Sequence, residues 1–382
     1  MQFRDLPKQY EVLKDTIDAA MISVAASAHF ISGPEVKELE KALAEYVGVK
    51  HCITCANGTD AINIAMRAWG VGKGDAVFVP DFTFFSSGEC PADEGATPIY
   101  VDVDQKTYNI DPVKLEEAVQ NVIAEGKYKA KAVVAVDLFG LPADYPAIKA
   151  VCEKYGLLLL EDGAQGFGGS INGKLACSFG DISTTSFFPA KPLGCYGDGG
   201  AIFTDNDEWA DLIRSICVHG KDTSNPNDPN AKYNNIRIGK NSRLDTIQAA
   251  ILLPKFKAFV DYELADVNKV AGWYTEGLKD TDLVLPEIAN GFYSSWAQYT
   301  IQLPDRVDRK ELQAKLKAAG IPSMVYYAKP MHCQGAFAGT DSANADCPMT
   351  VKLCATVLSL PLDPYKSKED IDFVVGEIKK AL

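Results

Sequence analysis

One lysine stands out because it lies in an apolar, proline-rich run. Lys191 is the only charged residue of Ser186-Phe187-Phe188-Pro189-Ala190-Lys191-Pro192-Leu193-Gly194. An amine among such side chains is expected to be partly desolvated, which lowers its pKa and makes it a usable nucleophile. Ser186, five residues earlier, could present its hydroxyl to the same ligand. Taken alone, without the other motifs, the segment favours a surface lysine without a chemical role.

A second group is a carboxylate that follows an apolar run. Asp162 lies in Glu161-Asp162-Gly163-Ala164-Gln165, directly after residues 157–160, which have the composition of a buried strand. A carboxylate at the end of such a strand is poorly hydrated and needs a partner. Asp162 is therefore a helix cap, part of a structural ion pair, or the counter-ion of a cationic ligand.

A third group has the features of an anion-binding turn. The segment Ala56-Asn57-Gly58-Thr59-Asp60 follows the apolar run 51–55. A strand followed by small residues and a helix start directs free backbone N–H groups at a ligand. The Thr59 hydroxyl adds a donor. The alternative is an ordinary turn in which Asn57 only caps the helix.

Together these groups match the needs of pyridoxal phosphate. That cofactor requires a lysine for a Schiff base, a carboxylate at its pyridinium nitrogen, a phosphate site and a flat surface for stacking. The chain offers Lys191, Asp162, the Gly58–Thr59 turn with Ser186, and the aromatic residues Phe82, Phe84 and Phe85. A nicotinamide site has little support, because the glycine-rich turn at residues 197–200 is not G-x-G-x-x-G.

The elements that would position these groups alternate between strands and helices. Strands are predicted at residues 51–55, 76–79, 98–101, 131–136, 157–160, 181–186 and 201–204, and several are apolar throughout. Such runs are typical of parallel strands covered on both faces. Helices are predicted from Gly58, capped by Asn57, and from Pro112, capped by Asp111. An open α/β sheet with ligands at the carboxyl ends of its strands follows.

The remainder of the chain predicts a smaller α+β unit. A long helical region is expected over residues 245–279, then strands at 298–302 and 323–326, a helix at 309–319 and a last helix after Ser367. We expect a large domain over residues 1–250 and a small domain over 251–382. The Pro- and Asn-rich stretch 224–235 is a loop. Near the N-terminus, Ile17, Met21 and Val24 indicate an amphipathic helix.

Composition excludes several classes of protein. With 38 Lys and Arg against 51 Asp and Glu, the formal charge is −13, which disfavours binding to nucleic acid or to anionic membranes. No apolar run approaches the roughly 20 residues needed to span a bilayer. Ten scattered cysteines favour free thiols and a cytoplasmic location. Cys52 and Cys55 have C-x-x-C spacing, but an odd separation in a strand puts them on opposite faces, so no metal site is expected.

The motifs, in this order, resemble the DegT/DnrJ/EryC1/StrS family of sugar-nucleotide aminotransferases, which have the aspartate aminotransferase (type I) fold. The resemblance covers nearly the whole chain, and its motifs are Gly33-Pro34-Glu35-Val36, Asn57-Gly58-Thr59-Asp60-Ala61, Glu161-Asp162, Ser186 to Lys191, Gly199-Gly200-Ala201-Ile202, Asn241-Ser242-Arg243-Leu244-Asp245, Gln248-Ala249-Ala250 and Ser359-Leu360-Pro361. The run 185–204 is similar to the branch that aminates UDP-2-acetamido-2-deoxy-3-oxo-hexuronate for surface polysaccharides.

The resemblance implies roles for individual residues. Lys191 would hold pyridoxal 5'-phosphate and move the proton, Asp162 would pair with the pyridinium nitrogen, and Gln165 would lie against the ring. Gly58, Thr59 and Ser186 would bind the phosphate, with Asn241 entering from the second subunit of a homodimer. Phe84 would stack on the ring, with Phe82 as the alternative. The implied substrate contacts are Arg243, also across the dimer, Tyr326, Tyr327 and His332.

The implied reaction moves an amino group, from glutamate, to C3 of a UDP-linked 3-keto-N-acetyl-hexuronic acid. Gly163, Tyr326 and His332 depart from the common pattern of the family, and the last two leave the sugar open. The alternatives are C4 or C3 amination of a 6-deoxy keto sugar nucleotide, a non-catalytic regulator that binds the cofactor, and a nicotinamide-dependent oxidoreductase. Lys191 argues against the related dehydratases, which have histidine there.

Overall fold

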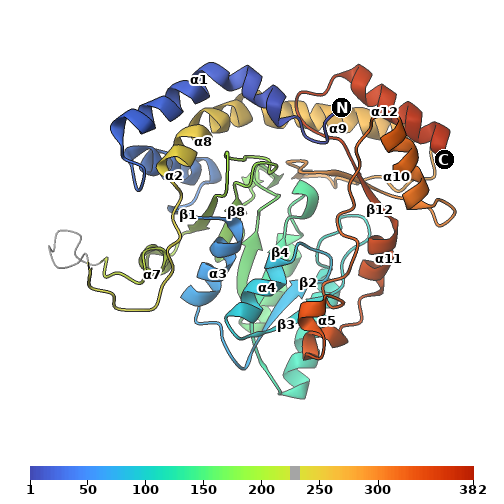
Figure 1. Ribbon diagram of the computed structural model, residues 1–382. Coiled ribbons are helices and arrows are strands. Elements are labelled where there is room, and N and C mark those ends of the chain that lie inside the picture. The colour runs from blue at the N-terminus through green and yellow to red at the C-terminus, as the bar shows by residue number, and fades with distance from the viewer. Residues whose placement is uncertain (224–232) are drawn as a thin grey trace.

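The centre of the protein is a mostly parallel sheet (Figure 1). The computed structural model describes residues 1–223 and 233–382, and in these the sheet has seven strands in the order β1-β9-β8-β5-β4-β2-β3. The neighbours from β8 to β3 run parallel, and β9 is antiparallel to both β1 and β8. The strands are β1 His51–Cys55, β2 Asp75–Pro80, β3 Thr97–Val101, β4 Lys129–Val136, β5 Leu158–Asp162, β8 Ile182–Ser186 and β9 Gly200–Thr204.

All seven strands predicted for this sheet are confirmed, with ends that shift by two residues or fewer. The informative difference is at β5, which continues through Glu161 and Asp162. These two acids pair in register with Ala135 and Val136 of β4. The sheet therefore fixes the backbone of both acids. The predicted α/β class is confirmed.

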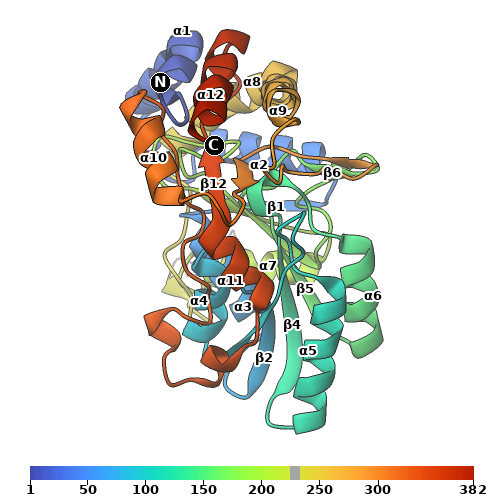
Figure 2. The same cartoon turned by 90° about the vertical axis from the view of Figure 1, so that its right-hand side faces the viewer.

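Helices cover both faces of the sheet (Figure 2). One face carries α3 Gly58–Ala68, α4 Ser86–Asp93 and α7 Asp207–Cys217, and the other carries α5 Pro112–Glu125 and α6 Tyr145–Tyr155. The two predicted caps are present, because Asn57 accepts from the backbone N–H of Asp60 and Asp111 from that of Val113. Cys52 and Cys55 point into different cores, as predicted, and both are free thiols.

A helical layer lies along one end of the sheet. It contains α1 Leu6–Ser27, α2 Pro34–Val47 and a long run made of α8 Thr246–Ala258, the π-helical turn η3 Phe259–Glu263 and α9 Leu264–Leu278. This run confirms the helical region predicted over 245–279. On α1, Ile17 and Val24 are fully buried and Met21 is half-buried, which confirms the apolar stripe.

The C-terminal part has a core of its own. It is built from α9, β11 Tyr299–Gln302, α10 Arg309–Ala318, β12 Val357–Leu360 and α12 Lys368–Ala381. The strand predicted at 323–326 is wrong, because only Met324 pairs, in an isolated bridge with Ser359. The tyrosines that follow turn away from β12 to meet other aromatic rings, so the ladder stops there.

The chain between these elements returns to the large core. This part of the chain contains the short turns η4 Gly335–Phe337 and η5 Asp341–Asn344 and the helix α11 Pro348–Thr356. Its side chains that pack against the core of the central sheet include Met331, Phe337 and Leu353. The remaining elements are the turn η1 Leu138–Gly140 and a small sheet of β6 Ser170–Ile171, β7 Lys174–Leu175 and β10 Phe292–Tyr293. The division at residue 250 stays a prediction, and α8 runs through that point.

Two further predictions from the sequence concern the loop 224–235 and the lack of a membrane-spanning segment. The predicted loop 224–235 lies outside the described residues except for its last three positions. In the described part of the chain, no helix has both the length and the apolar composition to cross a membrane.

The packing of α5 against the central sheet can be tested with two valines on this helix. Val119 is fully buried against the sheet, whereas Val113 is 65% exposed. Val119→Ala should lower the free energy of unfolding by about 2 kcal/mol, because it removes buried methyl groups and leaves a cavity. The matched change Val113→Ala should stay within about 0.5 kcal/mol of the parent. Urea unfolding of both variants measures this, and equal effects would contradict the packing.

Candidate active site

Asp162 and Lys191 lie at the edge of the sheet where the parallel strands end. Asp162 is the last residue of β5, and Lys191 lies in the loop after β8. Asp162 is 5% exposed and Lys191 is half-buried. Burial lowers the pKa of the Lys191 amine, and the negative charge of Asp162 opposes that shift. The predicted desolvated amine is thus present, with a buried carboxylate close enough to act on it.

Asp162 is held by groups that the sequence alone did not reveal. Ser87 donates its hydroxyl to Oδ2 of Asp162 at 2.8 Å, and the backbone N–H of Ala164 donates to Oδ1 at 3.3 Å. Burial raises the pKa of Asp162, whereas the Ser87 hydrogen bond and the Lys191 charge lower it. The Ser86-Ser87 pair at the start of α4, just after β2, was the signal that could have identified this partner.

The predicted phosphate residues gather at the start of α3. Gly58 is packed so closely on Ser186 that a Cβ at position 58 would lie 2.7 Å from the Ser186 Cβ. The Thr59 hydroxyl is 2.7 Å from that of Ser86, at the start of α4. Two helix N-termini and the hydroxyls of Thr59, Ser86 and Ser186 therefore lie close together, an arrangement that suits a phosphate.

Two aromatic residues were candidates for stacking, and the structure separates them. The Phe82 ring is 1% exposed and packs among core rings, including Phe139. Phe84 is 55% exposed and lies 6.4 Å, between ring centroids, from Tyr327. Only Phe84 leaves a ring face available to a ligand, so this geometry favours the first choice.

Gln165 and Tyr327 meet beside Asp162. The Gln165 side-chain amide donates to the Tyr327 hydroxyl at 3.2 Å, and its Oε1 accepts from the backbone N–H of Phe139 at 2.8 Å. Burial raises the pKa of Tyr327, so the phenol is neutral and can donate a hydrogen bond. Tyr326 packs edge-on against both Tyr327 and Phe3.

Asn241 and Arg243 lie beside the turn before α3, where the Ser242 hydroxyl accepts from the backbone N–H of Ala56 at 3.1 Å. Arg243 donates to Oδ1 of Asn241 at 2.7 Å, and both line a cleft of about 390 Å³ together with Asn57 and Asp198. In the described residues of a single chain, neither forms a hydrogen bond with Asp162 or Lys191. A lysine close by in sequence, Lys240, pairs with Asp60 at 3.4 Å.

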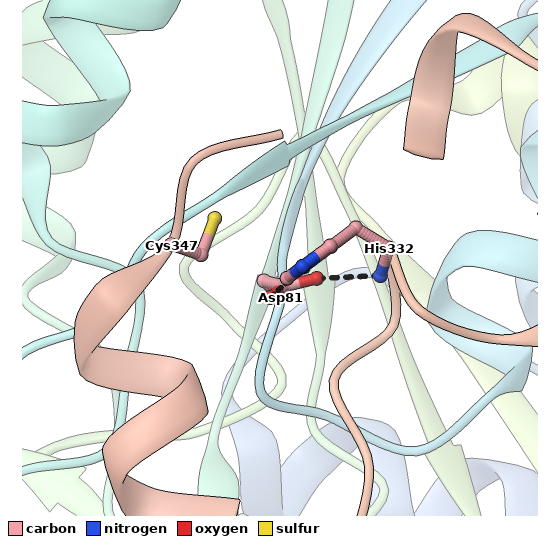
Figure 3. A group of neighbouring side chains, drawn as sticks. All are labelled: Asp81, His332 and Cys347. Carbon is pink, nitrogen blue, oxygen red and sulfur yellow. Dashed lines mark hydrogen bonds and ion pairs between the residues drawn. The ribbon is translucent and has the colours of Figure 1, made fainter. Parts of the chain in front are cut away.

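His332 is half-buried and lies beside two buried groups that could also ligate a metal, Asp81 and Cys347 (Figure 3). The backbone N–H of His332 donates to Oδ1 of Asp81 at 2.7 Å, and its Nδ1 lies 2.6 Å from Oδ2. Burial raises the pKa of the Cys347 thiol, and the nearby acids raise it further. Asp81 and His332 thus satisfy each other, and their pairing fastens the segment after Tyr327 to the end of β2.

The comparison with known proteins identifies the family. The sequence pattern of the DegT/DnrJ/EryC1/StrS aminotransferase family matches residues 11–379. This chain belongs to that family. A UDP-2-acetamido-2-deoxy-3-oxo-D-glucuronate aminotransferase of Pseudomonas aeruginosa is 46% identical over 99% of both chains. A pleiotropic regulatory protein of Geobacillus stearothermophilus is 44% identical over 98% of this chain and 96% of its own.

Solved structures agree with the fold of this DegT-family aminotransferase. A DegT/DnrJ/EryC1/StrS aminotransferase from Brucella abortus has a TM-score of 0.94 at 46% identity, over 100% of this chain and 99% of that one. NtdA from Bacillus subtilis, solved with bound cofactor PMP, has a TM-score of 0.86 at 30% identity, over 96% and 81%. The predicted type I fold is confirmed.

The residues of this chain fit the cofactor of the family, pyridoxal phosphate. Gly58 and Ser186 lie too close together for a Cβ at position 58, the Asp162 carboxyl is buried, and burial lowers the pKa of the Lys191 amine. The exposed Phe84 ring completes the requirements that the sequence set out. The chain is therefore a pyridoxal phosphate-dependent aminotransferase. The role of each residue remains a prediction.

The closeness of Gly58 to Ser186 yields a test of the phosphate site. Gly58→Ala forces the start of α3 and Ser186 apart, since no real Cβ tolerates a 2.7 Å contact. Overpacking of this kind costs about 1–3 kcal/mol, so the Kd for pyridoxal phosphate should rise about tenfold or more. The control is Gly272→Ala in α9, where a Cβ meets open space. Fluorescence titration measures both; an unchanged Kd for Gly58→Ala would remove this turn from the site.

Proposed function

We propose that this aminotransferase transfers an amino group from glutamate to C3 of a UDP-linked 3-keto-N-acetyl-hexuronic acid. The reaction class rests above all on one observation, the half-buried Lys191 amine beside the buried Asp162 carboxylate. The choice of sugar is supported by the Pseudomonas aeruginosa relative, an aminotransferase for a UDP-linked 3-oxo-glucuronate.

In the proposed reaction, each of these active-site residues has a different role. Bound pyridoxal phosphate supplies an electron-withdrawing ring that makes the carbon bearing the amine acidic. Lys191, with its pKa lowered by burial, takes that proton and returns it at the adjacent position. Asp162 holds a positive charge at the ring nitrogen, and Ser87 orients this carboxylate. Gln165 and Tyr327 form the adjoining wall of the site.

We further propose that two copies of the chain share their active sites. Asn241 and Arg243 line a cleft beside Asn57 of their own chain, and no hydrogen bond links them to Asp162 or Lys191 within the described residues. The segment just before them exposes Ile236 and Ile238 by 52% and 84%. Apolar side chains exposed this far are typical of a surface that a partner covers. In a homodimer, Asn241 would reach the phosphate and Arg243 the substrate carboxylate of the other copy.

A second candidate function is a regulator that binds the cofactor without turnover, and the name of the Geobacillus stearothermophilus relative favours it. Such a protein would need neither Arg243 nor a half-reaction with glutamate. The 6-deoxy keto sugar nucleotides remain the alternative substrates. The cytoplasmic location inferred from the cysteines stays a prediction.

Lys191→Ala tests the reaction class. The parent protein, loaded with pyridoxal phosphate, should lose its visible absorbance when glutamate is added and recover it on addition of a UDP-linked keto sugar. Lys191→Ala should slow this cycle by at least about 100-fold, because proton transfer by a positioned side chain contributes that much. The exposed Lys329→Ala is the matched control. A parent protein that binds the cofactor but never responds to glutamate would instead be the regulator.

Arg243→Ala tests the sugar. A charge-assisted hydrogen bond contributes about 1.5–3 kcal/mol, so kcat/KM for the 3-keto uronate should fall roughly 10- to 100-fold. With a neutral UDP-linked 3-keto sugar the change should be much smaller, because no carboxylate is lost. Equal losses on both substrates would assign Arg243 to the dimer or the cofactor instead, and no loss on either would remove it from the site.

A further inference from the structure

Two carboxyl groups meet beneath the turn that carries Asp162 and Gln165. Glu161 lies in β5, and Asp137 follows the last residue of the neighbouring strand β4. Both side chains are completely buried, and the charge of Glu161 acts on the Asp137 carboxyl. The backbone N–H of Asp137 also donates to the carbonyl of Asp162 at 3.1 Å, so the pair is part of the sheet edge.

The surroundings of Glu161 are those of a carboxylate. Its Oε1 accepts from the backbone N–H of Cys177 at 2.5 Å. Its Oε2 accepts from the backbone N–H groups of Phe179 and Gly180, at 2.7 and 3.2 Å, and from the Ser183 hydroxyl at 2.7 Å. Four donors around one acid stabilise its charged form and oppose the effect of burial on its pKa.

The surroundings of Asp137 differ between its two oxygens. Oδ1 accepts from the Tyr145 hydroxyl at 2.7 Å and from the backbone N–H of Ala143 at 3.1 Å. Oδ2 is buried and meets no donor among the described residues. A bare carboxylate oxygen next to a second carboxylate would be strongly destabilising.

We propose that Asp137 carries a proton on Oδ2 at neutral pH and donates it to Glu161, so that the two carboxyl groups hold a single negative charge. This makes Oδ2 a donor and removes the only unsatisfied atom of the pair. Burial, and next the charge of Glu161, raise the pKa of Asp137 well above its usual value. The other titratable groups that face Asp137 are the Tyr145 phenol on α6 and the Cys177 thiol, and burial raises both of their pKa values, so both are neutral.

The pair also positions the active-site turn. A Cβ at Gly166 would lie 2.2 Å from Oδ2 of Asp137, so the turn rests directly on this acid. The stretch that begins at Asp137 also holds Gln165, through the backbone N–H of Phe139. Two negative charges here would push β4 and β5 apart beneath Asp162. This positioning role rests on the proposed function, whereas the protonation of Asp137 does not.

Asp137→Asn tests the proposal, because an amide copies a neutral carboxylic acid: Nδ2 donates to Glu161 and Oδ1 keeps its two donors. At pH 7 in D₂O, the infrared spectrum of the parent should contain a carboxylic-acid C=O band that is missing in Asp137→Asn. Asp111→Asn, at a half-buried helix cap, is the matched control and should keep the band. The spectrum needs neither cofactor nor substrate. If Asp137→Asn keeps every carboxylic-acid band of the parent, the proposal is wrong.

Unfolding provides a second readout. An acid with a raised native pKa keeps its proton after the unfolded chain has lost it, so its contribution to stability falls as pH rises from about 4 to the native pKa. Relative to Asp137→Asn, the unfolding equilibrium constant of the parent should therefore grow about tenfold per pH unit in that range. A pH-independent ratio would contradict a protonated Asp137.

Function and folding can be separated in the same series. Asp137→Asn should keep the glutamate half-reaction. Asp137→Ala removes both the carboxylate that accepts from Tyr145 at 2.7 Å and the proposed donor to Glu161, and it should lose the half-reaction. If Asp137→Asn does not fold, the infrared spectrum is instead recorded on parent protein labelled with 4-¹³C-aspartate. The absence of any isotope-shifted carboxylic-acid band at pH 7 would then overturn the proposal. A positive infrared result with an inactive parent would refute only the proposed function.

Discussion

A carboxyl group taken out of water at the end of a parallel strand governs the arrangement of this active site. Asp162 is buried, and burial raises its pKa, so groups around it must favour the charged form if it is to hold a cation. Ser87 from the start of α4 and Lys191 from the loop after β8 both act in that direction. Because parallel strands end at one edge, helix starts and loops from distant parts of the sequence converge on this single acid.

The same edge explains how an acidic protein can bind anions. The net charge of −13 describes the surface as a whole, but the space around Gly58, Thr59 and Ser186 is bounded by two helix N-termini and hydroxyl groups. Backbone dipoles supply positive potential there, and Lys240, which pairs with Asp60, lies at the start of the same helix. The proposed dimer would add Arg243 from the other copy. Local structure, not composition, therefore sets which ligands the site accepts.

The sequence predicted the strands and caps well, because apolar runs and Asn or Asp before a helix act locally. It also predicted Lys191 and Asp162, whose types conflict with their apolar neighbours. It did not predict Ser87, since nothing in the sequence shows that the start of α4 reaches the end of β5. The Asp137–Glu161 pair was missed for the same reason: the two acids are 24 positions apart and meet only because β4 and β5 are neighbours. The strand expected at 323–326 failed because aromatic packing overrode the local pattern.

The central claim is that Lys191 is the amine that engages the cofactor opposite Asp162. The most direct measurement is to load the protein with pyridoxal phosphate, reduce the linkage with borohydride, digest the protein and locate the labelled lysine by mass spectrometry. The account predicts one labelled peptide that contains Lys191. The buried Lys255, whose pKa burial lowers to about 8, is the strongest competing amine in the described chain. A label on Lys255, or on several lysines with Lys191 unmodified, would contradict the account.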